Sequence, residues 1–400
     1  MEDIITELAA TGTLAIAAFG AVFCMMQSKA SAVKSSFAAF LAAVAINNAP
    51  DAFGRLIEAV PGPLAASVDV ITWPSSFFLA PLFWVYVSRL TSAPDEQSQR
   101  HGRHFVLPGL TIILAVAMML SPPDIRNMLG AEEPKTDTAW SMFTVLAFGL
   151  FQLAVFPQIL IYLFLIWRRL MKFRLRLRDV YASTEQHELR WIFVICGLVG
   201  LFWLAHIVLL VTVISMPDGA VPLGSTTFAN TAGLALVAST VLWGLRQRPP
   251  LVPDEDDPHP PEPPKPQSAG KYEKSALSAE ASHRLGRKLR AAMEVDHLHR
   301  DPNLSLWALA RHIGASPNYV SQTLNEEIGE SFFDFVNGYR VAEAQKLLTT
   351  TNQSILAITY EVGFNARSSF YNAFKRITGQ TPSYFRKNMS QPVGLDDIGA

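Results

Sequence analysis

The sequence has few charged residues for its length, and they are unevenly placed. Asp, Glu, Lys and Arg make up 17% of the 400 residues, and half of all residues are hydrophobic. Soluble proteins carry roughly 25% charged residues. The shortage lies almost entirely within residues 1–246, and the rest of the chain has an ordinary composition. This distribution excludes a single soluble domain and predicts a membrane part followed by a soluble part.

Cysteine is nearly absent, and so are the common catalytic motifs. Cys24 and Cys196 both lie in apolar runs, where we interpret them as small hydrophobic side chains. Two such residues exclude a disulfide framework and a cysteine-based zinc site. The chain has no His-Glu-x-x-His, phosphate-binding loop or Gly-x-Ser-x-Gly motif. We therefore predict that the protein is not an enzyme and uses no cofactor or metal.

Seven apolar runs are long enough, or nearly so, to cross a bilayer as helices of about 20 residues. The runs lie near residues 8–27, 37–57, 68–89, 104–121, 140–167, 190–215 and 225–246. The second run is the weakest, because Asn47, Asn48 and Asp51 interrupt it. The first run follows an acidic start, which predicts a membrane helix rather than a cleaved signal peptide.

Basic residues in the connections predict how these runs cross the membrane. With the N-terminus outside, the inward connections and the end of the last run carry 14 Lys and Arg residues, and the outward connections carry three. The outward residues are Arg55, Arg126 and Lys135. Because cytoplasmic loops are enriched in Lys and Arg, the pattern predicts seven crossings with the C-terminal part in the cytoplasm. The outward loop 122–139 is short and acidic.

Residues 247–273 predict a linker with no packed core. Nine prolines lie between Pro249 and Gln267, together with an acidic cluster at 254–257. Proline-rich chain favours the extended polyproline II conformation, so we interpret this segment as a solvated spacer. The predicted domains are a transmembrane domain over 1–246, the linker over 247–273, a cytoplasmic domain over 274–390 and a tail over 391–400.

Helical spacing of apolar residues predicts a first helix-turn-helix unit after a helix near 280–294. Leu306, Leu309 and Ile313 bury one face of a short helix. Gly314 and Ala315 then make a turn. Ser316 and Pro317 follow as the cap and first residue of a second helix, over 317–327. A joining helix over 331–348 would measure about 27 Å, which suits two helices one DNA turn of roughly 34 Å apart.

A second unit of the same kind follows the joining helix. Its inward-facing apolar residues are Ile355, Ile358, Val362, Phe370, Phe374 and Ile377. Gly363 predicts the end of its first helix, Asn365 is predicted to cap its second helix over 366–378, and Pro382 opens a last short helix. Arg340, in the joining helix, lies among apolar neighbours. We interpret it as a structural residue, with a phosphate contact as the alternative.

Polar residues on the second helix of each unit are the predicted contacts to double-stranded DNA. Hydroxyl, amide and guanidinium groups are the types that bind phosphates and base edges. In the first unit they are Ser316, Asn318, Tyr319, Ser321 and Gln322. In the second unit they are Asn365, Arg367, Ser368, Ser369, Tyr371, Asn372, Lys375 and Arg376.

Residues 280–389 resemble the DNA-binding domain of the AraC/XylS family of bacterial transcription regulators. The matching residues are Leu306, Leu309-Ala310, Ser316 to Ser321, Phe332, Arg340, Ala344, Leu347-Leu348, Ile355, Ile358, Val362 to Phe364, Ser369 to Tyr371, Phe374 to Arg376, Gly379, Thr381-Pro382, Tyr384 and Arg386. The resemblance covers a little over a quarter of the chain. It implies two recognition helices in successive major grooves, homodimers on repeated promoter sites, and a bacterial cytoplasmic membrane as the location.

The sequence departs from the family pattern in three features. Thr359 stands where the family has alanine, and Glu326 and Glu327 end the first reading helix, where basic residues are common. Residues 275–390 carry 13 basic and 10 acidic residues. Such a small excess predicts modest attraction to DNA in general, so specific affinity would depend on dimerisation.

Polar residues within the apolar runs are the candidate signal-sensing groups, because such residues are costly in a membrane. They are Asn47, Asn48 and Asp51, which share one face of a helix, together with Gln152 and His206. They would line a ligand cavity or act as a protonation switch. The alternative is that they only form hydrogen bonds between helices.

The sequence as a whole predicts an all-α protein: a polytopic seven-helix membrane bundle followed by a cytoplasmic double helix-turn-helix domain. The function it indicates is a membrane-embedded, one-component transcription regulator that responds to a small-molecule or membrane signal, with altered dimerisation as the response. One alternative is a membrane transport or receptor protein with an appended DNA-binding module. Another is a tethered regulator released by proteolysis.

Overall fold

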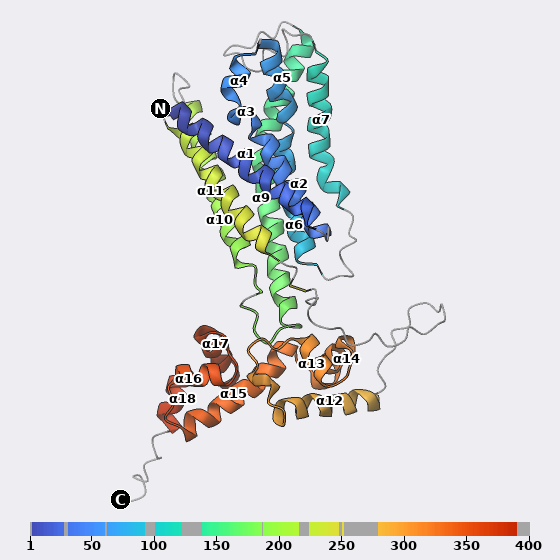
Figure 1. The fold of residues 1–400 in the computed structure, drawn as a ribbon, viewed down its shortest axis with the longest axis vertical. Coiled ribbons are helices and arrows are strands. Elements are labelled where there is room, and N and C mark those ends of the chain that lie inside the picture. The colour runs from blue at the N-terminus through green and yellow to red at the C-terminus, as the bar shows by residue number, and fades with distance from the viewer. Residues whose placement is uncertain are drawn as a thin grey trace, which may run out of the picture. The chain divides into compact units, whose positions relative to one another are not determined.

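The structure is a computed structural model that describes residues 2–27, 31–60, 62–92, 101–121, 138–185, 187–215, 224–247, 250–251 and 279–389. Within these ranges the regular elements are all helices (Figure 1). The all-α class predicted from the sequence is therefore confirmed. The chain divides into two compact units. Unit 1 comprises residues 1–171 and 189–252, and unit 2 comprises residues 172–188 and 253–400.

Unit 1 is a bundle of apolar helices. Its elements are α1 (Glu2–Met26), α2 (Ala32–Asn47), α3 (Ala49–Ala52), α4 (Gly54–Glu58), α5 (Gly62–Thr72), α6 (Ser75–Leu90), η2 (Gly102–Phe105), α7 (Val106–Met119), α9 (Ala139–Leu177), α10 (Arg190–Ser215) and α11 (Ser225–Arg246). Six segments of the described chain are long and apolar enough to cross a membrane: Ile4–Met26, Ser67–Leu90, Gly102–Met119, Ala139–Leu177, Arg190–Ser215 and Ser225–Arg246. They coincide with six of the seven predicted runs.

The remaining predicted run, 37–57, is interrupted where the sequence indicated. α2 ends at Asn47 after 16 residues, and α3 begins at Ala49 with a proline in its first turn. Proline suits a helix start but not a helix interior. Asn48, between the two helices, keeps a right-handed helical conformation, and its carbonyl oxygen accepts the Ala52 N–H at 3.0 Å. The shared face predicted for Asn47, Asn48 and Asp51 stays a prediction. A seventh crossing stays a prediction.

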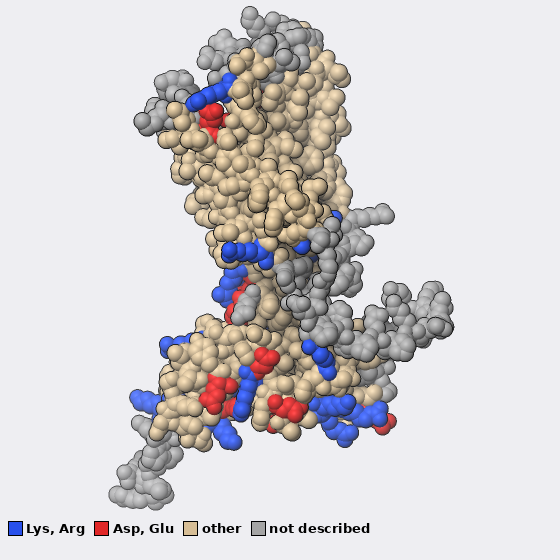
Figure 2. Space-filling model, in the orientation of Figure 1, with Lys and Arg blue, Asp and Glu red and all other residues tan. Residues whose placement is uncertain are grey.

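The surface of unit 1 is apolar between its ends. Only 6% of the most apolar 18-residue stretch of α10 is buried inside the structure. Leu201, Val208 and Ile214 of this helix are exposed. On the face that Figure 2 shows, charged side chains of this unit lie at its ends and are nearly absent between them. An apolar patch of this size on a protein marks contact with lipid or with another protein.

α9 is much longer than its predicted apolar run at 140–167. It extends to Leu177, and its end, from Lys172 onward, belongs to unit 2. Arginine is a good helix former, and Arg174 and Arg176 lie in the last turn, where positive charge is favourable. One helix therefore contributes residues to both units.

Unit 2 contains the predicted double helix-turn-helix. Its elements, besides the end of α9, are α12 (Ala279–Glu294), η4 (Leu298–Arg300), α13 (Leu306–His312), α14 (Pro317–Thr323), η5 (Leu324–Ile328), α15 (Phe332–Thr350), α16 (Ile355–Glu361), α17 (Arg367–Thr378) and α18 (Pro382–Met389). Its described residues form two hydrophobic cores, one for each helix-turn-helix unit. α15 contributes Phe332 and Phe335 to the first core and Val341 and Ala344 to the second, so this single helix joins the two.

Serine caps set most helix starts in unit 2. The hydroxyls of Ser305, Ser316, Ser331 and Ser354 each accept a hydrogen bond from the backbone N–H three residues later. Such a cap contributes about 1 kcal/mol. Gly363 ends α16 with a φ of 95°, and a Cβ there would lie 2.5 Å from the carbonyl oxygen of His299. Glycine is therefore required at this position by both conformation and space.

Candidate nucleic-acid interface

α14 buries its apolar side and leaves its polar residues accessible. Val320 and Thr323 are buried in the first core, whereas Asn318 is exposed. The predicted residues Tyr319, Ser321 and Gln322 are half-buried. The predicted helix over 317–327 changes form after Thr323 and continues as the π-helix η5. Ser316 acts as the predicted cap, since its hydroxyl accepts the Tyr319 N–H at 3.3 Å.

α17 has the same two-sided character. Phe370, Ala373 and Phe374 are buried, whereas the predicted contacts Arg367, Ser368, Asn372, Lys375 and Arg376 are exposed, and Ser369 and Tyr371 are half-buried. The inward position predicted for Ile377 is wrong, because its side chain is 46% exposed. α17 ends one residue later, at Thr378, so this last turn projects beyond the core.

Asn365 does not cap α17 as predicted. The capping position is Ala366, which makes no side-chain cap. The Asn365 amide instead donates to the carbonyl oxygen of Pro302 at 3.0 Å. It ties the second helix-turn-helix unit to the loop before α13, a contact between residues 63 positions apart.

Several predicted DNA contacts are held by neighbouring side chains. In α14, Gln322 donates to Glu326 at 2.8 Å. In α17, the Arg367 guanidinium lies 4.9 Å from the centre of the Tyr371 ring and donates to its hydroxyl at 3.2 Å. The hydrogen bond with Ser383, followed by that with Arg367, lowers the pKa of Tyr371 from its usual value. These bonds fix the side chains in one orientation without burying them.

Arg376 is paired with an acid on α15. Its guanidinium forms an ion pair with Asp334 and lies 5.4 Å from the centre of the Phe333 ring. Lys375, next to it, is exposed. To neutralise a phosphate, Arg376 must therefore break its ion pair with Asp334 or contact both groups at once. Lys375 already faces solvent.

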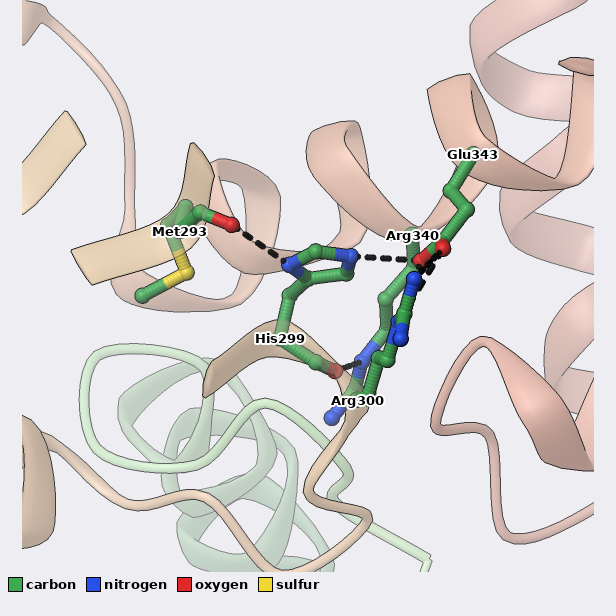
Figure 3. A network of polar contacts seen from close by, with 5 residues as sticks. All are labelled: Met293, His299, Arg300, Arg340 and Glu343. Atoms are coloured by element: carbon green, nitrogen blue, oxygen red, sulfur yellow. Dashed lines mark hydrogen bonds and ion pairs between the residues drawn. The ribbon is translucent and has the colours of Figure 1, made fainter. Parts of the chain in front are cut away.

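A polar network at the joint between the two helix-turn-helix units was missed by the sequence reasoning (Figure 3). His299 is buried, with Nδ1 3.0 Å from the Met293 carbonyl oxygen and Nε2 2.7 Å from the Glu343 carboxylate. The same carboxylate accepts from Arg300 at 3.0 Å. Burial raises the pKa of Glu343, but the hydrogen bonds from Arg300 and His299 outweigh it and hold the pKa below its usual value.

Arg340 lies at the centre of this joint, and its contacts agree with the predicted structural role. Its side chain is fully buried. It donates to the carbonyl oxygens of His299 and Asp301, both at 2.7 Å, and lies 5.3 Å from the centre of the Phe364 ring. Burial lowers its pKa to about 10, against the opposing effect of Asp301 and Glu185. It remains charged at neutral pH and is unavailable to phosphate.

Thr359 fits its buried position through one hydrogen bond. Its side chain has no exposure, and its hydroxyl donates to the Ile355 carbonyl oxygen at 2.8 Å. A buried hydroxyl needs such a partner, so the departure from alanine at this position leaves no unpaired polar group.

The candidate sensing residues in unit 1 do not meet in one place. Asn47 donates to Ser75 at 3.2 Å, and Asn48 donates to the Val44 carbonyl oxygen at 2.9 Å. Asp51 is hydrogen-bonded to the side chain of Asn230. Gln152 accepts from Trp73 at 3.2 Å, and Nδ1 of His206 lies 2.9 Å from the Phe202 carbonyl oxygen. These contacts favour the alternative interpretation, in which the residues form hydrogen bonds within and between helices.

The linker over 247–273 and the acidic loop over 122–139 lie almost wholly outside the described residues. The predictions made for them remain predictions.

Comparison with known proteins finds relatives of the C-terminal part of the chain. Residues 309–388 match the family profile described as a helix-turn-helix domain. The arabinose operon regulatory protein of Escherichia coli (strain K12) is 33% identical over 98 residues, which are 24% of this chain and 33% of that protein. An uncharacterized HTH-type transcriptional regulator of Staphylococcus aureus (strain COL) is 33% identical over 99 residues, which are 25% of this chain and 13% of that protein.

A solved structure also matches this part. The C-terminal domain of AraT, a response regulator from Geobacillus stearothermophilus, is 26% identical, with a TM-score of 0.26, and covers 31% of this chain and 97% of that chain. The chain thus spans a third or less of the curated relatives it matches. The resemblance stated from the motifs is confirmed for this region, and the C-terminal part of the chain carries a helix-turn-helix domain of the AraC type.

Proposed function

We propose that this chain is a membrane-embedded, one-component transcription regulator that binds promoter DNA through α14 and α17. One observation carries the proposal: a double helix-turn-helix of the AraC type is on the same chain as six helices apolar enough to cross a membrane. Such helices would anchor the chain in a bacterial cytoplasmic membrane. The DNA-binding part then needs no separate protein to link it to events in that membrane.

Charge supports the cytoplasmic side for unit 2. The inward connections carry the excess of Lys and Arg that cytoplasmic loops have, and DNA is available only on that side. The signal would act on the spanning helices. It would change DNA binding only by interacting differently with the bound and unbound states. The response that we favour is altered pairing of two copies of unit 2 on DNA.

The experiment is capture of the DNA that the full-length chain binds in bacterial cells. Cells expressing the chain are cross-linked with formaldehyde, membranes are separated from the soluble fraction, and the DNA recovered with the chain is sequenced. The matched control is the double variant Arg367→Ala, Lys375→Ala, which alters two exposed residues of α17 and should leave abundance and fractionation unchanged.

We expect discrete genomic sites, recovered from the membrane fraction and lost in the double variant. Equal recovery by both proteins would contradict sequence-specific reading by α17. A soluble fragment of about residues 250–400 would instead support release by proteolysis. Solute uptake into vesicles by a chain lacking unit 2 would support the transport alternative.

A further inference from the structure

Residues 172–188, which are the end of α9 and its connection to α10, belong to unit 2. We call them the strap. Tyr181 of the strap and Ser305 form an isolated antiparallel bridge. Beside it, the N–H of Leu306 donates to the carbonyl oxygen of Val180 at 2.8 Å. The strap is therefore bound by backbone hydrogen bonds at the point where α13 begins.

The centre of the strap is bound to the joint of the helix-turn-helix units. The N–H of Ala182 donates to Leu304 at 3.2 Å, and its carbonyl oxygen accepts from the amide of Asn337 at 3.2 Å. Arg340 donates to the hydroxyl of Ser183 at 3.1 Å. Ala182, Asn337 and Arg340 are all buried. The strap thus supplies the acceptor for the buried Asn337 amide and one of several acceptors for the buried Arg340 guanidinium.

Two further residues of the strap contact α13 and the first turn of α15. The Tyr181 ring meets Trp307 of α13 edge-on, with the ring centres 5.8 Å apart. The carbonyl oxygen of Arg178 accepts the Phe333 N–H at 2.9 Å, and its guanidinium lies 5.4 Å from the centre of the Phe333 ring. Arg376 of the reading helix α17 lies at the same distance from that ring. The strap and α17 therefore share one aromatic residue.

The position of the strap within unit 2 bears on DNA binding. In Figure 1 the strap meets this unit at the edge where α13 and α17 lie, and α12 lies along the opposite edge. In helix-turn-helix proteins the first helix of the pair crosses the DNA backbone while the second lies in the major groove. The strap covers the start of that first helix, α13, and extends to the neighbourhood of α17.

The strap is also additional to the family domain. The helix-turn-helix match covers residues 309–388 and lies far from 172–188 in the sequence. A DNA-binding domain of this type is therefore recognised without such a segment.

We propose that the strap is an autoinhibitory contact: while it is docked on α13 and α15 it excludes DNA, and it must undock before α14 and α17 can bind together. This inference rests on the proposed function. Because strap docking and DNA binding use the same edge, each lowers the apparent affinity of the other. The chain leads from the strap directly into α9 on one side and α10 on the other. A change in these spanning helices can therefore bias the docked state without passing through the proline-rich linker.

The experiment locks the strap with a disulfide. Residues opposite each other in an antiparallel bridge have Cα atoms about 4.5–5.5 Å apart, which is within the range of about 4.4–6.8 Å that disulfides span. The variant is Tyr181→Cys, Ser305→Cys in a full-length chain with Cys24→Ala and Cys196→Ala. Its affinity for a duplex recovered in the chromatin capture is measured in lipid nanodiscs, before and after reduction. The single variant Tyr181→Cys, treated identically, is the control.

The oxidised double variant should bind the duplex at least tenfold more weakly than the reduced one, and reduction should restore binding. The control should not respond to oxidation. Failure of the disulfide to form in the folded chain would show that the strap is not docked and would overturn the proposal. Equal affinity in the two redox states would also overturn it, while leaving the proposed function intact. If the capture recovers no specific sites, the proposed function fails first, and this inference fails with it.

A second variant tests the opposite direction. Arg178→Ala, Tyr181→Ala removes the contacts of the strap with Phe333 and Trp307 but changes no residue of α14 or α17, and should raise affinity for the same duplex severalfold. Arg168→Ala, an exposed change on α9 outside the strap, should not. Weaker binding by the strap variant, with α15 still protected from hydrogen exchange, would mean that the strap supports DNA binding and would refute autoinhibition.

Discussion

At the residue scale, only some of the side chains that hold unit 2 together belong to the family motif. The motif marked Arg340, and its apolar neighbours correctly indicated a structural role. Its partners were not predictable, because it donates to backbone carbonyls and to a hydroxyl 157 positions away. His299 and Glu343 carry no local signal at all, because a histidine in a short helical turn and an acid on a helix are common in any sequence.

Glu343 gives the pH prediction for this joint. Because its folded pKa lies below its usual value of 4.5, it contributes stability that is present above the unfolded pKa and is lost as the pH falls through the folded one. Glu343→Gln should lower the opening free energy of α15 by about 1–3 kcal/mol at pH 7. The difference from wild type should shrink as the pH falls below 4.5.

Amide hydrogen exchange across α15 of the full chain measures this opening free energy. Glu330→Gln, which changes an exposed acid just before α15, is the matched control and should have little effect. A destabilisation by Glu343→Gln that stayed constant from pH 7 to well below pH 4 would show that the carboxylate charge is not what stabilises the joint.

At the element scale, helix positions follow from local chemistry, and the sequence predicted them well. Serine caps, a proline at the start of α14 and glycine after α16 set the boundaries within one or two residues. The errors lie where tertiary contacts override local preference. Asn365 is drawn to Pro302 instead of capping, and Ile377 lies on a turn that projects past the core. α9 continues beyond its apolar run because arginine also favours a helix.

The two reading helices differ in how freely they present their residues. Arg367 of α17 is exposed and held over Tyr371, which orients it at little cost in side-chain entropy. Arg367→Ala should weaken binding to a captured duplex by about 1–3 kcal/mol if the residue contacts a base. Competition binding with single-base variants of the duplex should also show relaxed specificity at one position.

Lys346→Ala removes a basic residue from an exposed site on α15 and serves as the control of equal charge change. An effect of Arg367→Ala below a few tenths of a kcal/mol, or no larger than that of Lys346→Ala, would mean that Arg367 is a solvated surface residue.

At the scale of the whole molecule, composition predicted the division into an apolar and a soluble part but not the strap. The contacts of the strap join residues more than 100 positions apart, and no periodicity or motif records such a pairing. In the sequence alone, this segment is one of the basic inward connections between two membrane runs. Its backbone pairing with residues 304–306 appears only in three dimensions.

The weak net charge of the DNA-binding part sets the last prediction. With 13 basic and 10 acidic residues over 275–390, and with Arg340 and Arg376 engaged internally, one copy offers little net positive charge to phosphate. Specific binding should therefore need two copies on two sites. Deleting one of two repeated sites from a captured duplex should weaken binding at least tenfold. It should also roughly halve the slope of log K against log salt, which is about −0.9 for each phosphate neutralised.

A duplex with both sites intact but separated by an extra half turn of about five base pairs is the informative comparison. It keeps every base and phosphate contact available and changes only whether two copies of unit 2 face the same side of the DNA. Affinity that falls with the half-turn insertion and returns with a full turn would show that pairing between copies supplies the binding energy. An affinity that is unchanged by the insertion and by deletion of one site would mean that a single copy binds DNA unaided. The small net positive charge of that copy would then have to suffice, together with base contacts from α14 and α17.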